Sequence, residues 1–481
     1  MSTTSTPSVP QQRSLADVVD IVSGFGFPKE LQGKPKGDLP FFKVGDISIA
    51  WNSGQKNLTQ AQHYLDQAEA SSIRAKAFPK GTVVFAKIGE AIRLNRRAIL
   101  GQPSIVDNNV MGLIPKEGVV DPTYLFYWSL MLRLGDISQA TTVPSVRKSD
   151  VEQLSFPWLP LDQQKRIVAE IEKQFSRLDE AVANLKRVKA NLKRYKAAVL
   201  KAAVEGRLVE TEAEIARREG RSYETGEQLL QRILATRRSQ WQGKGKYKEP
   251  AAPDTTDLPE LPAGWTWCGF EQVSVADKHA LKAGPFGSAL KKELYIESGY
   301  KIYGQEQVIR GDSKFGDYFI DETKFRELES CAVKPGDLLI SLVGTTGKVL
   351  VLPQNTMPGI INPRLLKLSL NHSHISPEYA AYMLQSGLAS HYFKLQAHGG
   401  TMEILNLGII KALPVPLPPA AEQQRLVAEV DRRFSFLRQI EAQVDVNLQR
   451  RTVGLQQTIL VHAFAGHLLW DGAVSVAHEM R

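Results

Sequence analysis

Two stretches of the chain repeat apolar side chains every seven residues. The first series is Ile171, Leu178, Leu185, Leu192 and Val199, and a companion series three positions later is Ala181, Val188, Tyr195 and Ala202. The second is Val430, Leu437 and Val444, after which the spacing shifts by four to Leu448 and Leu455. Such heptads are typical of long helices that pack on a partner helix, and the shift indicates a stutter. We predict two long helices with their seams packed together, although one stripe alone also fits an ordinary core helix.

The two heptad stretches belong to an internal repeat. From Gln164 to Ser176, seven of thirteen residues are identical to those from Gln423 to Ser435. Both helices follow prolines, and both copies end with a glycine, at Gly206 and Gly466. The repeat length of about 259 residues is far too long for a solenoid. The chain is therefore predicted to be a duplicated module.

A more variable region precedes each helix. FPKGTVVFAKIG, from Phe78, resembles VKPGDLLISLVG, from Val333, and Asp121–Tyr124 aligns with Ser376–Tyr379 at the same offset. These regions are rich in glycine and in short alternating apolar runs, which favours mixed α/β domains. We expect two globular α/β domains separated by two long antiparallel helices, with an internal pseudo-two-fold repeat. Their strand order is beyond the reach of one sequence.

Proline, glycine and charge divide the chain into segments. We predict a disordered tail over 1–13, a variable α/β domain over 14–155, a helix over 156–207, a linker with a helical part over 208–263, a second variable α/β domain over 264–410, a second helix over 411–470 and a tail over 471–481. The linker carries Arg237, Arg238, Lys244, Lys246 and Lys248 among Trp241 and Tyr247. This group could touch a nucleic-acid backbone, but a solvated connector is the favoured interpretation.

Composition narrows the class of protein. The chain has 481 residues, 43% of them hydrophobic and 23% charged, which is typical of a globular protein of two to four domains. Its net charge of +9 indicates a polyanionic partner without proving one. Two cysteines cannot form a disulfide framework, no apolar run is long enough to span a membrane, and the first residues do not resemble a secretory signal. We expect a cytoplasmic protein.

Motifs for catalysis are weak. Gly344–Lys348 lacks the first glycine and the serine or threonine of a phosphate loop, and Asn362-Pro363-Arg364 lacks the aromatic residue of an amino-methyltransferase motif. Glu322-Thr323-Lys324 behind Asp312 and Asp317 could pass for the metal-holding carboxylate–lysine cluster of a nuclease, but such short acidic spacings are common in polar loops. The pair His372 and His374 lacks a cysteine or carboxylate at the spacing of a zinc site, so a surface loop is the favoured interpretation. We therefore predict no catalytic, cofactor-binding or metal-binding residues, and a chain that binds rather than catalyses.

The duplicated motifs resemble the DNA-specificity subunit of type I restriction–modification enzymes. The resemblance rests on the two helices that carry Q-x-R-x-V-A-E, the endings AVEGRL and AFAGHL, the run LPELPAGWTW, and GTTGKVLVLP with MPGIINPRLLKL. It extends from about Ser14 to Trp470. The first half lacks counterparts of Trp265, Trp267 and Gly399–Thr401, so no base can be assigned to either half.

This resemblance implies a function and a set of partners. Each variable region would be a target-recognition domain that reads one half of a split, asymmetric site in duplex DNA, with an unread spacer whose length is set by the helix pair. The chain would be a non-catalytic subunit that directs adenine methylation and DNA cleavage, and thereby phage defence. The partners would be two copies of an adenine methyltransferase subunit and a motor-nuclease subunit. These partners, not this chain, would hold S-adenosylmethionine, ATP and Mg²⁺.

Cationic and amide side chains are the natural candidates for contacts with DNA, because they can bind phosphates or base edges. In the first variable region the candidates are Lys87, Arg93, Arg96, Arg97, Asn108 and Asn109. In the second they are Lys291, Lys292, Gln305, Gln307, Arg310, Lys348 and Arg364.

One helix adds a basic stretch. Residues 186–201 hold seven basic side chains and no acidic one, and Lys186, Arg187 and Lys193 are its candidates for contact with the DNA spacer. Acidic helices of the methyltransferase subunit are the alternative partner. Two other functions stay open at this point, a subunit of a related complex whose partner fuses methylase and nuclease, and a coiled-coil scaffold that does not bind DNA.

Overall fold

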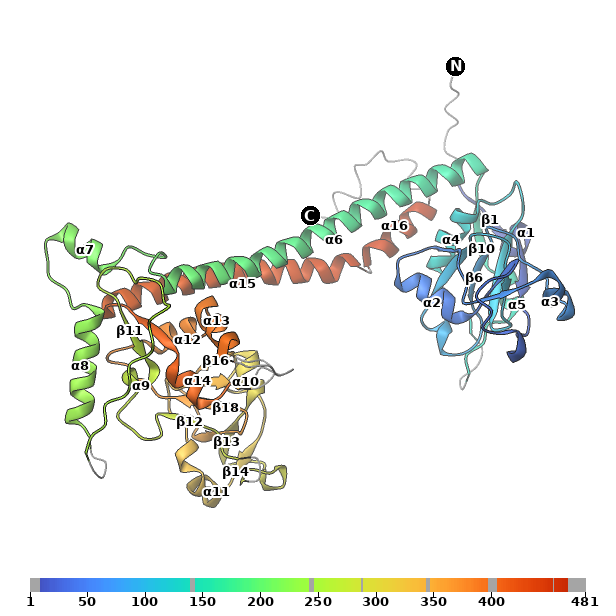
Figure 1. Ribbon diagram of the computed structural model, residues 1–481. Coiled ribbons are helices and arrows are strands. Elements are labelled where there is room, and N and C mark those ends of the chain that lie inside the picture. The colour runs from blue at the N-terminus through green and yellow to red at the C-terminus, as the bar shows by residue number, and fades with distance from the viewer. Residues whose placement is uncertain are drawn as a thin grey trace. The chain divides into compact units, whose positions relative to one another are not determined.

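The computed structural model describes residues 9–138, 143–241, 246–286, 289–342, 347–396, 405–452 and 454–465. The chain divides into two compact units (Figure 1). The first unit comprises Met1–Lys186 and Asp445–Arg481, and the second comprises Arg187–Val444. Within the described residues, no helix has both the length and the apolar character needed to cross a membrane.

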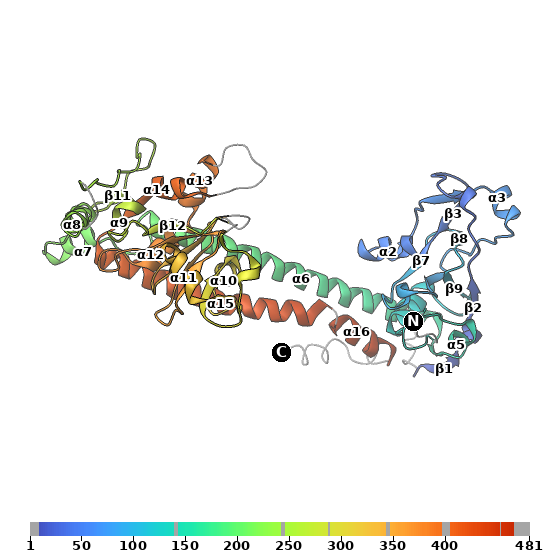
Figure 2. The same cartoon turned by 90° about the horizontal axis from the view of Figure 1, so that it is seen from below.

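The variable region of the first unit is built on two sheets, and a third, two-stranded sheet is described below (Figure 2). The larger has the order β2 (Val19–Ser23), β9 (Val110–Pro115), β6 (Val83–Ala86), β7 (Arg97–Leu100) and β4 (Asn57–Leu58). The smaller has the order β5 (His63–Leu65), β3 (Leu39–Phe42) and β8 (Ile105–Val106). The short α-helices of this unit are α1 (Leu15–Val18), α2 (Val44–Asn52), α3 (Gln67–Ser72), α4 (Pro122–Met131) and α5 (Lys148–Glu152). Strand β6 is buried along its whole length, which explains its uninterrupted apolar sequence VVFA.

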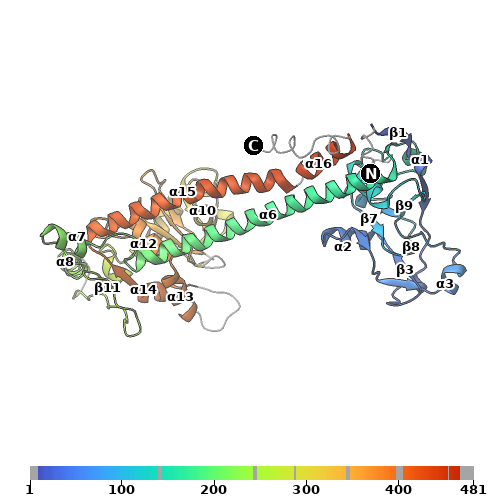
Figure 3. The same cartoon turned by 90° about the horizontal axis from the view of Figure 1, so that it is seen from above.

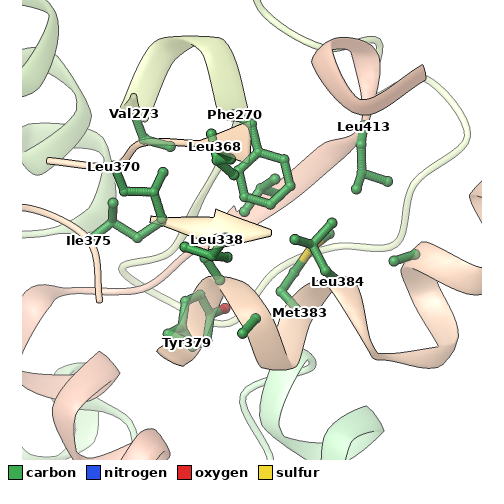
Figure 4. Close-up of a cluster of buried hydrophobic side chains, with 14 of the residues drawn as sticks. Phe270, Val273, Leu338, Leu368, Leu370, Ile375, Tyr379, Met383, Leu384 and Leu413 are labelled. Atoms are coloured by element: carbon green, nitrogen blue, oxygen red, sulfur yellow. The ribbon is translucent and has the colours of Figure 1, made fainter. Parts of the chain in front are cut away.

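The second unit repeats this arrangement, except that its larger sheet has four strands where the first has five. One sheet has the order β12 (Leu281–Ala283), β18 (Leu365–Leu368), β15 (Leu338–Ser341) and β16 (Val349–Val351). The other has the order β14 (Phe319–Ile320), β13 (Tyr300–Tyr303) and β17 (Gly359–Ile361). Its shorter helices are α9 (Phe270–Val273), α10 (Gln305–Arg310), α11 (Glu322–Glu327), α12 (Pro377–Leu384), α13 (Gly387–Gln396) and α14 (Leu407–Ala412). Figure 4 shows side chains of α12, such as Tyr379 and Met383, packed beside Leu338 of β15 in the main core.

Matched hydrogen bonds show that the two units are copies of one fold. The hydroxyl of Tyr124 donates to the carbonyl of Pro157 at 2.7 Å, and that of Tyr379 donates to Pro416 at 2.8 Å. The amide nitrogen of Gln164 donates to the carbonyl of Leu159, and its oxygen accepts the N–H of Asp121. Gln423 makes the same two bonds, to Pro418 and Ser376. The predicted duplication and the mixed α/β class are therefore confirmed.

A two-stranded sheet precedes each long helix. Strand β1 (Gln11–Ser14) pairs with β10 (Ser155–Trp158), and β11 (Thr266–Gly269) pairs with β19 (Pro414–Leu417). The predicted disordered tail over 1–13 was therefore too long, because residues 11–13 lie in a strand. The prolines of β10 and β19 are tolerated because a strand with one partner leaves half of its N–H groups outside the ladder.

The long helices begin directly after prolines, as their sequences indicate. Helix α6 (Leu161–Val204) follows Pro160, and α15 (Ala420–Thr452) follows Pro419 and is succeeded by α16 (Gly454–Phe464). Within the second unit, Lys196 pairs with Glu441 at 2.6 Å, while Val199 and Val204 share a core with Leu426 and Val430. Rising numbers on α6 thus meet falling numbers on α15, so the two helices run antiparallel, side by side in Figures 1 and 3. In the first unit, Ile167 and Ile171 share a core with residues of α16.

The two heptad series differ in burial. In the series on α6 the buried residues are Ile171, Leu178, Leu192 and Val199, and in the series on α15 they are Val430, Leu437 and Val444. Leu185, Leu448 and Leu455 are half-buried. In the companion series, Val188 and Tyr195 are exposed, so the packed stripe on α6 is narrower than the sequence indicates. The shift in spacing after Val444 precedes the end of α15 and the start of α16.

The predicted linker is largely a folded part of the second unit. Its helices α7 (Glu212–Glu219) and α8 (Gly226–Ser239) are each capped by a threonine, Thr211 and Thr225. Leu229 and Ile233 of α8 are buried in the main core. The helical part expected within residues 208–263 is therefore present, but α8 is packed into the core of the second unit and is not a solvated connector. The sequence interpretation missed that the apolar residues of α8 form one face at helical spacing.

Candidate nucleic-acid interface

Four strands of the first unit meet at one end of its larger sheet. The antiparallel register pairs Ser23 with Met111 and Phe85 with Arg97. Strands β2 and β6 therefore end where β7 and β9 begin. The candidates that follow or precede these strand ends are Lys87, Arg93, Arg96, Asn108 and Asn109. We call this group of loops the first sheet end.

Hydrogen bonds hold the first sheet end together. The Nζ of Lys87 donates to Ser23 Oγ at 2.9 Å, and the backbone N–H of Lys87 donates to the carbonyl of Asn109 at 2.8 Å. The carboxylate of Asp107 accepts the N–H of Asn109 at 2.7 Å and so closes a tight turn. Asn108 and Asn109 are exposed at the tip of this turn, where an amide side chain can present a donor and an acceptor to a base edge.

The second unit has an equivalent end of the equivalent sheet. Strand β15 ends at Ser341 opposite Leu365, the first residue of β18. In the turn before β18, Asn362 Oδ1 accepts the N–H of Arg364 at 3.0 Å. Arg364 and Lys348 are exposed beside these strand ends. Gln305 is half-buried and donates to Ser341 Oγ at 2.8 Å, which places it at the same location, the second sheet end.

A glycine makes each turn possible. A Cβ atom on Gly24 would lie 2.0 Å from the carbonyl oxygen of Asp107, and one on Gly284 would lie 1.9 Å from that of Asn362. Both distances are far below van der Waals contact, so a side chain at either position would push the turn away. Sequence reasoning missed Gly24, Gly284 and Asp107 as positioning residues. The signal that could have found them is the alignment of Asp107 with Asn362, at the same offset as Tyr124 and Tyr379.

Two candidate DNA contacts are buried instead. Arg97 is fully buried and donates to the carbonyls of Asn95 at 2.5 Å and Leu132 at 2.7 Å. Burial lowers the pKa of Arg97 to about 9, so the guanidinium stays charged at neutral pH. Gln307 is buried, accepts the N–H of Gly304 and donates to the carbonyl of Phe315. Both predictions were wrong in this structure because these side chains satisfy backbone groups inside the fold.

Other candidates lie outside the turns. Lys291 and Lys292 are exposed on the segment between β12 and β13. Arg310 is exposed and places its guanidinium 3.9 Å from the centre of the Phe315 ring, which fixes its orientation. In the predicted linker, Arg237 donates to the carbonyls of Ser274 and Val275 and so braces the fold.

The basic stretch of α6 is mostly solvent-facing. Lys186, Arg187 and Lys193 are exposed on this helix, whereas Lys196 is committed to Glu441. The exposed cations can attract a polyanion without reading its sequence.

Acidic groups near the first sheet end are not arranged as a metal site. Burial raises the pKa of Asp107, and burial likewise raises that of Asp46, whose carboxylate accepts the N–H of Lys43 at 2.7 Å. Among the described residues, no group of three or more His, Cys, Asp or Glu side chains could hold a metal ion. Within the second unit, Asp321 caps α11 through the N–H of Lys324, which gives the acidic segment around Glu322 a structural role.

The geometry defines a class of protein with two copies of one α/β module, each presenting different polar residues on an equivalent turn. Comparison with known proteins gives the family. The pattern of the family described as "Type I restriction modification DNA specificity domain" matches residues 8–194 and 287–448. The chain belongs to this family, as its resemblance predicted.

Individual relatives agree with this assignment. The chain is similar to the type I restriction enzyme EcoBI specificity subunit of Escherichia coli, with 23% identity over 95% of this chain and 85% of that protein. It is 22% identical to the EcoKI specificity subunit of Escherichia coli K12, over 84% of this chain and 82% of that protein.

Two solved structures share the fold. The HsdS subunit from Thermoanaerobacter tengcongensis has a TM-score of 0.50 and 20% identity, over 96% of this chain and 98% of its own. A chain from a structure of complex assembly in the type I R-M system has a TM-score of 0.56 and 18% identity, over 96% of this chain and 99% of its own.

Proposed function

We propose that this chain is the sequence-specific DNA recognition subunit of a type I restriction–modification complex. It reads a bipartite, asymmetric target in duplex DNA, with one half-site for each unit and an unread spacer between them. The observation that carries the proposal is the repeated turn at equivalent sheet ends. The same backbone presents Asn108 and Asn109 in one unit and Pro363 and Arg364 in the other. Two different half-sites can be read by one repeated backbone that presents different side chains to the DNA in each unit.

Base readers and phosphate contacts divide among the candidates that are exposed or half-buried. Asn108, Asn109 and Arg364 have amide or guanidinium groups that can pair with base edges. Lysines such as Lys87 and Lys348 hold the phosphate backbone as point charges. The exposed cations of α6 add affinity that depends on salt and not on sequence.

Catalysis belongs to the partners under this proposal. An adenine methyltransferase subunit, present in two copies, binds S-adenosylmethionine, and a motor-nuclease subunit uses ATP and Mg²⁺. The duplicated helical regions suit two copies, because each half of this chain offers its own version of the same docking surface. Family membership favours neither the scaffold interpretation nor the partner that fuses methylase and nuclease.

Methylation sequencing of host DNA, with and without this gene, tests the function directly. We expect deletion of the gene to remove one split, asymmetric, adenine-methylated motif. The sequence of the lost motif then identifies the two half-sites and the length of the spacer. Restoring the gene is the control and must restore the same motif. An unchanged set of methylated motifs, in a host that expresses both this chain and the methyltransferase, would contradict the proposal.

The stoichiometry is a separate test. Native mass spectrometry of the purified complex is expected to give one copy of this chain with two methyltransferase subunits. A homo-oligomer of this chain without methyltransferase would instead support the scaffold.

A further inference from the structure

One aromatic side chain of the second unit stands almost entirely in water. Phe286 is 90% exposed, more than any other large apolar side chain that the structure describes. Exposing a phenyl ring is unfavourable compared with burying it, so such a ring is a candidate for burial against a partner.

The backbone fixes where Phe286 lies. Gly284 donates its N–H to the carbonyl of Leu365 at 2.9 Å and is in close contact with Asn362. Phe286 follows two residues later, so its Cα lies within about 7 Å of Gly284. The backbone of Phe286 therefore belongs to the loop that leaves β12 at the second sheet end, where Arg364 precedes β18. The N–H of Ala289 donates to the carbonyl of Phe286 at 2.8 Å and holds this part of the backbone.

In the first unit, the aromatic side chains of the equivalent loop are packed against other rings. Its equivalent glycine, Gly24, is followed by Phe25, whose ring lies 6.2 Å from that of Phe78, and by Phe27, which stacks on Phe41 at 3.7 Å. Both of these rings are partly covered by the unit's own core. Among the described residues of the second unit, no ring or core side chain covers Phe286 in this way, and the ring is 90% exposed. Packing therefore explains the aromatic residues of the first loop and does not explain Phe286.

We propose that Phe286 is a specificity-determining residue that contacts the 5-methyl group of a thymine in the half-site read by the second unit. The proposal rests on the DNA-recognition function above. In the major groove, hydrogen-bonding groups read the polar base edges, and the thymine methyl group is the apolar feature that a phenyl ring can recognise. Arg364, in the neighbouring turn at the same sheet end, would supply the polar contact, so that the two side chains together distinguish bases that neither distinguishes alone.

The test is a scan of the second half-site with deoxyuridine. Replacing thymine by deoxyuridine removes one methyl group and keeps the base pair. Binding of the assembled complex to each substituted duplex is measured for the wild-type chain, for Phe286→Ala and for Met357→Ala. Met357 is a matched control, because it is also exposed in the second unit but precedes β17, at the opposite end of that strand from Asn362.

We expect one thymine position at which deoxyuridine weakens wild-type binding about fourfold, which corresponds to one methyl group removed from water. This loss should disappear in Phe286→Ala and persist in Met357→Ala. If Phe286→Ala keeps the loss, or if no thymine in that half-site shows one, the inference is wrong although the proposed function stands. If Phe286→Ala impairs co-purification of the methyltransferase and leaves base discrimination intact, Phe286 contacts protein and the inference is also wrong. Wild-type binding without any sequence preference would contradict the proposed function itself.

Discussion

Arg97 shows why a charged residue in a recognition domain need not contact DNA. Its guanidinium donates to two backbone carbonyls, and Asn95 is held in the left-handed region with φ of 53°. Arg97→Met leaves those carbonyls unpaired in the core, and we expect the free energy of unfolding to fall by about 1–3 kcal/mol with base preference unchanged. Thermal unfolding and binding to half-site variants measure the two effects.

The neighbouring Arg96 is the control for that experiment. Arg96 precedes β7 at the first sheet end and is only half-buried, whereas Arg97 is fully buried. Arg96→Met should therefore have little effect on the free energy of unfolding, and it should change DNA affinity if Arg96 contacts DNA. An Arg97→Met chain with unchanged stability and altered preference at one base would show that the buried arrangement is not the one that binds DNA.

Glu212 joins three elements of the second unit. Its buried carboxylate pairs with Arg221 and with Arg425 of α15, each at 2.7 Å. Burial raises the pKa of this carboxyl, but hydrogen bonds from Arg425 and Arg221 outweigh it, and the net pKa is lowered. A lowered pKa means that the folded state binds the proton less tightly than the unfolded state. The contribution of Glu212 to stability is therefore present above its unfolded pKa, about 4.3, and is lost as pH falls through the folded pKa.

We accordingly expect Glu212→Gln to reduce the free energy of unfolding of the second unit by about 1–3 kcal/mol at neutral pH. The difference from wild type should shrink below about pH 4. Urea unfolding followed at several pH values measures both. Glu210→Gln is the matched control, since Glu210 pairs with Arg218 at an exposed site, where ion pairs contribute little. A Glu212→Gln effect that grows as pH falls would contradict this account.

The basic stretch of α6 makes a prediction about salt. Changing Lys186, Arg187 and Lys193 together to glutamine should lower the slope of log affinity against log salt by about 2–3, if each contacts one phosphate. Lys165, Arg166 and Arg177, exposed elsewhere on α6, provide a control triple with the same change in charge. If the two triple variants had equal salt slopes, Lys186, Arg187 and Lys193 would have no specific role in contacting DNA. Loss of methyltransferase co-purification would then assign these cations to the partner subunit.

At the scale of elements, sequence patterns predicted what local physics controls. The start of α6 follows from Pro160 and its buried stripe from the heptads, because both depend on neighbours a few residues away. The burial of Arg97 and Gln307 depends on partners distant in sequence, such as Leu132 for Arg97. Strand order also depends on partners distant in sequence, so it could not be predicted from the sequence alone. The candidate site could be predicted only as cationic and amide residues in the loops of the two variable regions.

Duplication organises the whole molecule. Each half contains its own sheet end, its own tyrosine bond to a proline carbonyl and its own glutamine at the start of the long helix. The scaffold is thus preserved where it supports the turn, while the turn itself differs. New target sequences can arise by changing a few exposed side chains without loss of the fold.

Separate units predict independent half-sites. Asn109→Ala and Arg364→Ala should each cost about 1–3 kcal/mol at one base position, the first in one half-site and the second in the other. Because the two residues belong to different compact units, the double variant should lose the sum of the two within about 0.5 kcal/mol.

Competition binding against duplexes that vary one base pair at a time measures the position and size of each loss. Lys36→Ala, an exposed cation outside both turns, is the control and should leave every position unchanged. If both variants altered positions in the same half-site, the assignment of one half-site to each unit would be wrong. If the losses fell in different halves but were strongly non-additive, the two halves would be coupled through the bound DNA, and shape as well as direct contact would contribute to target choice.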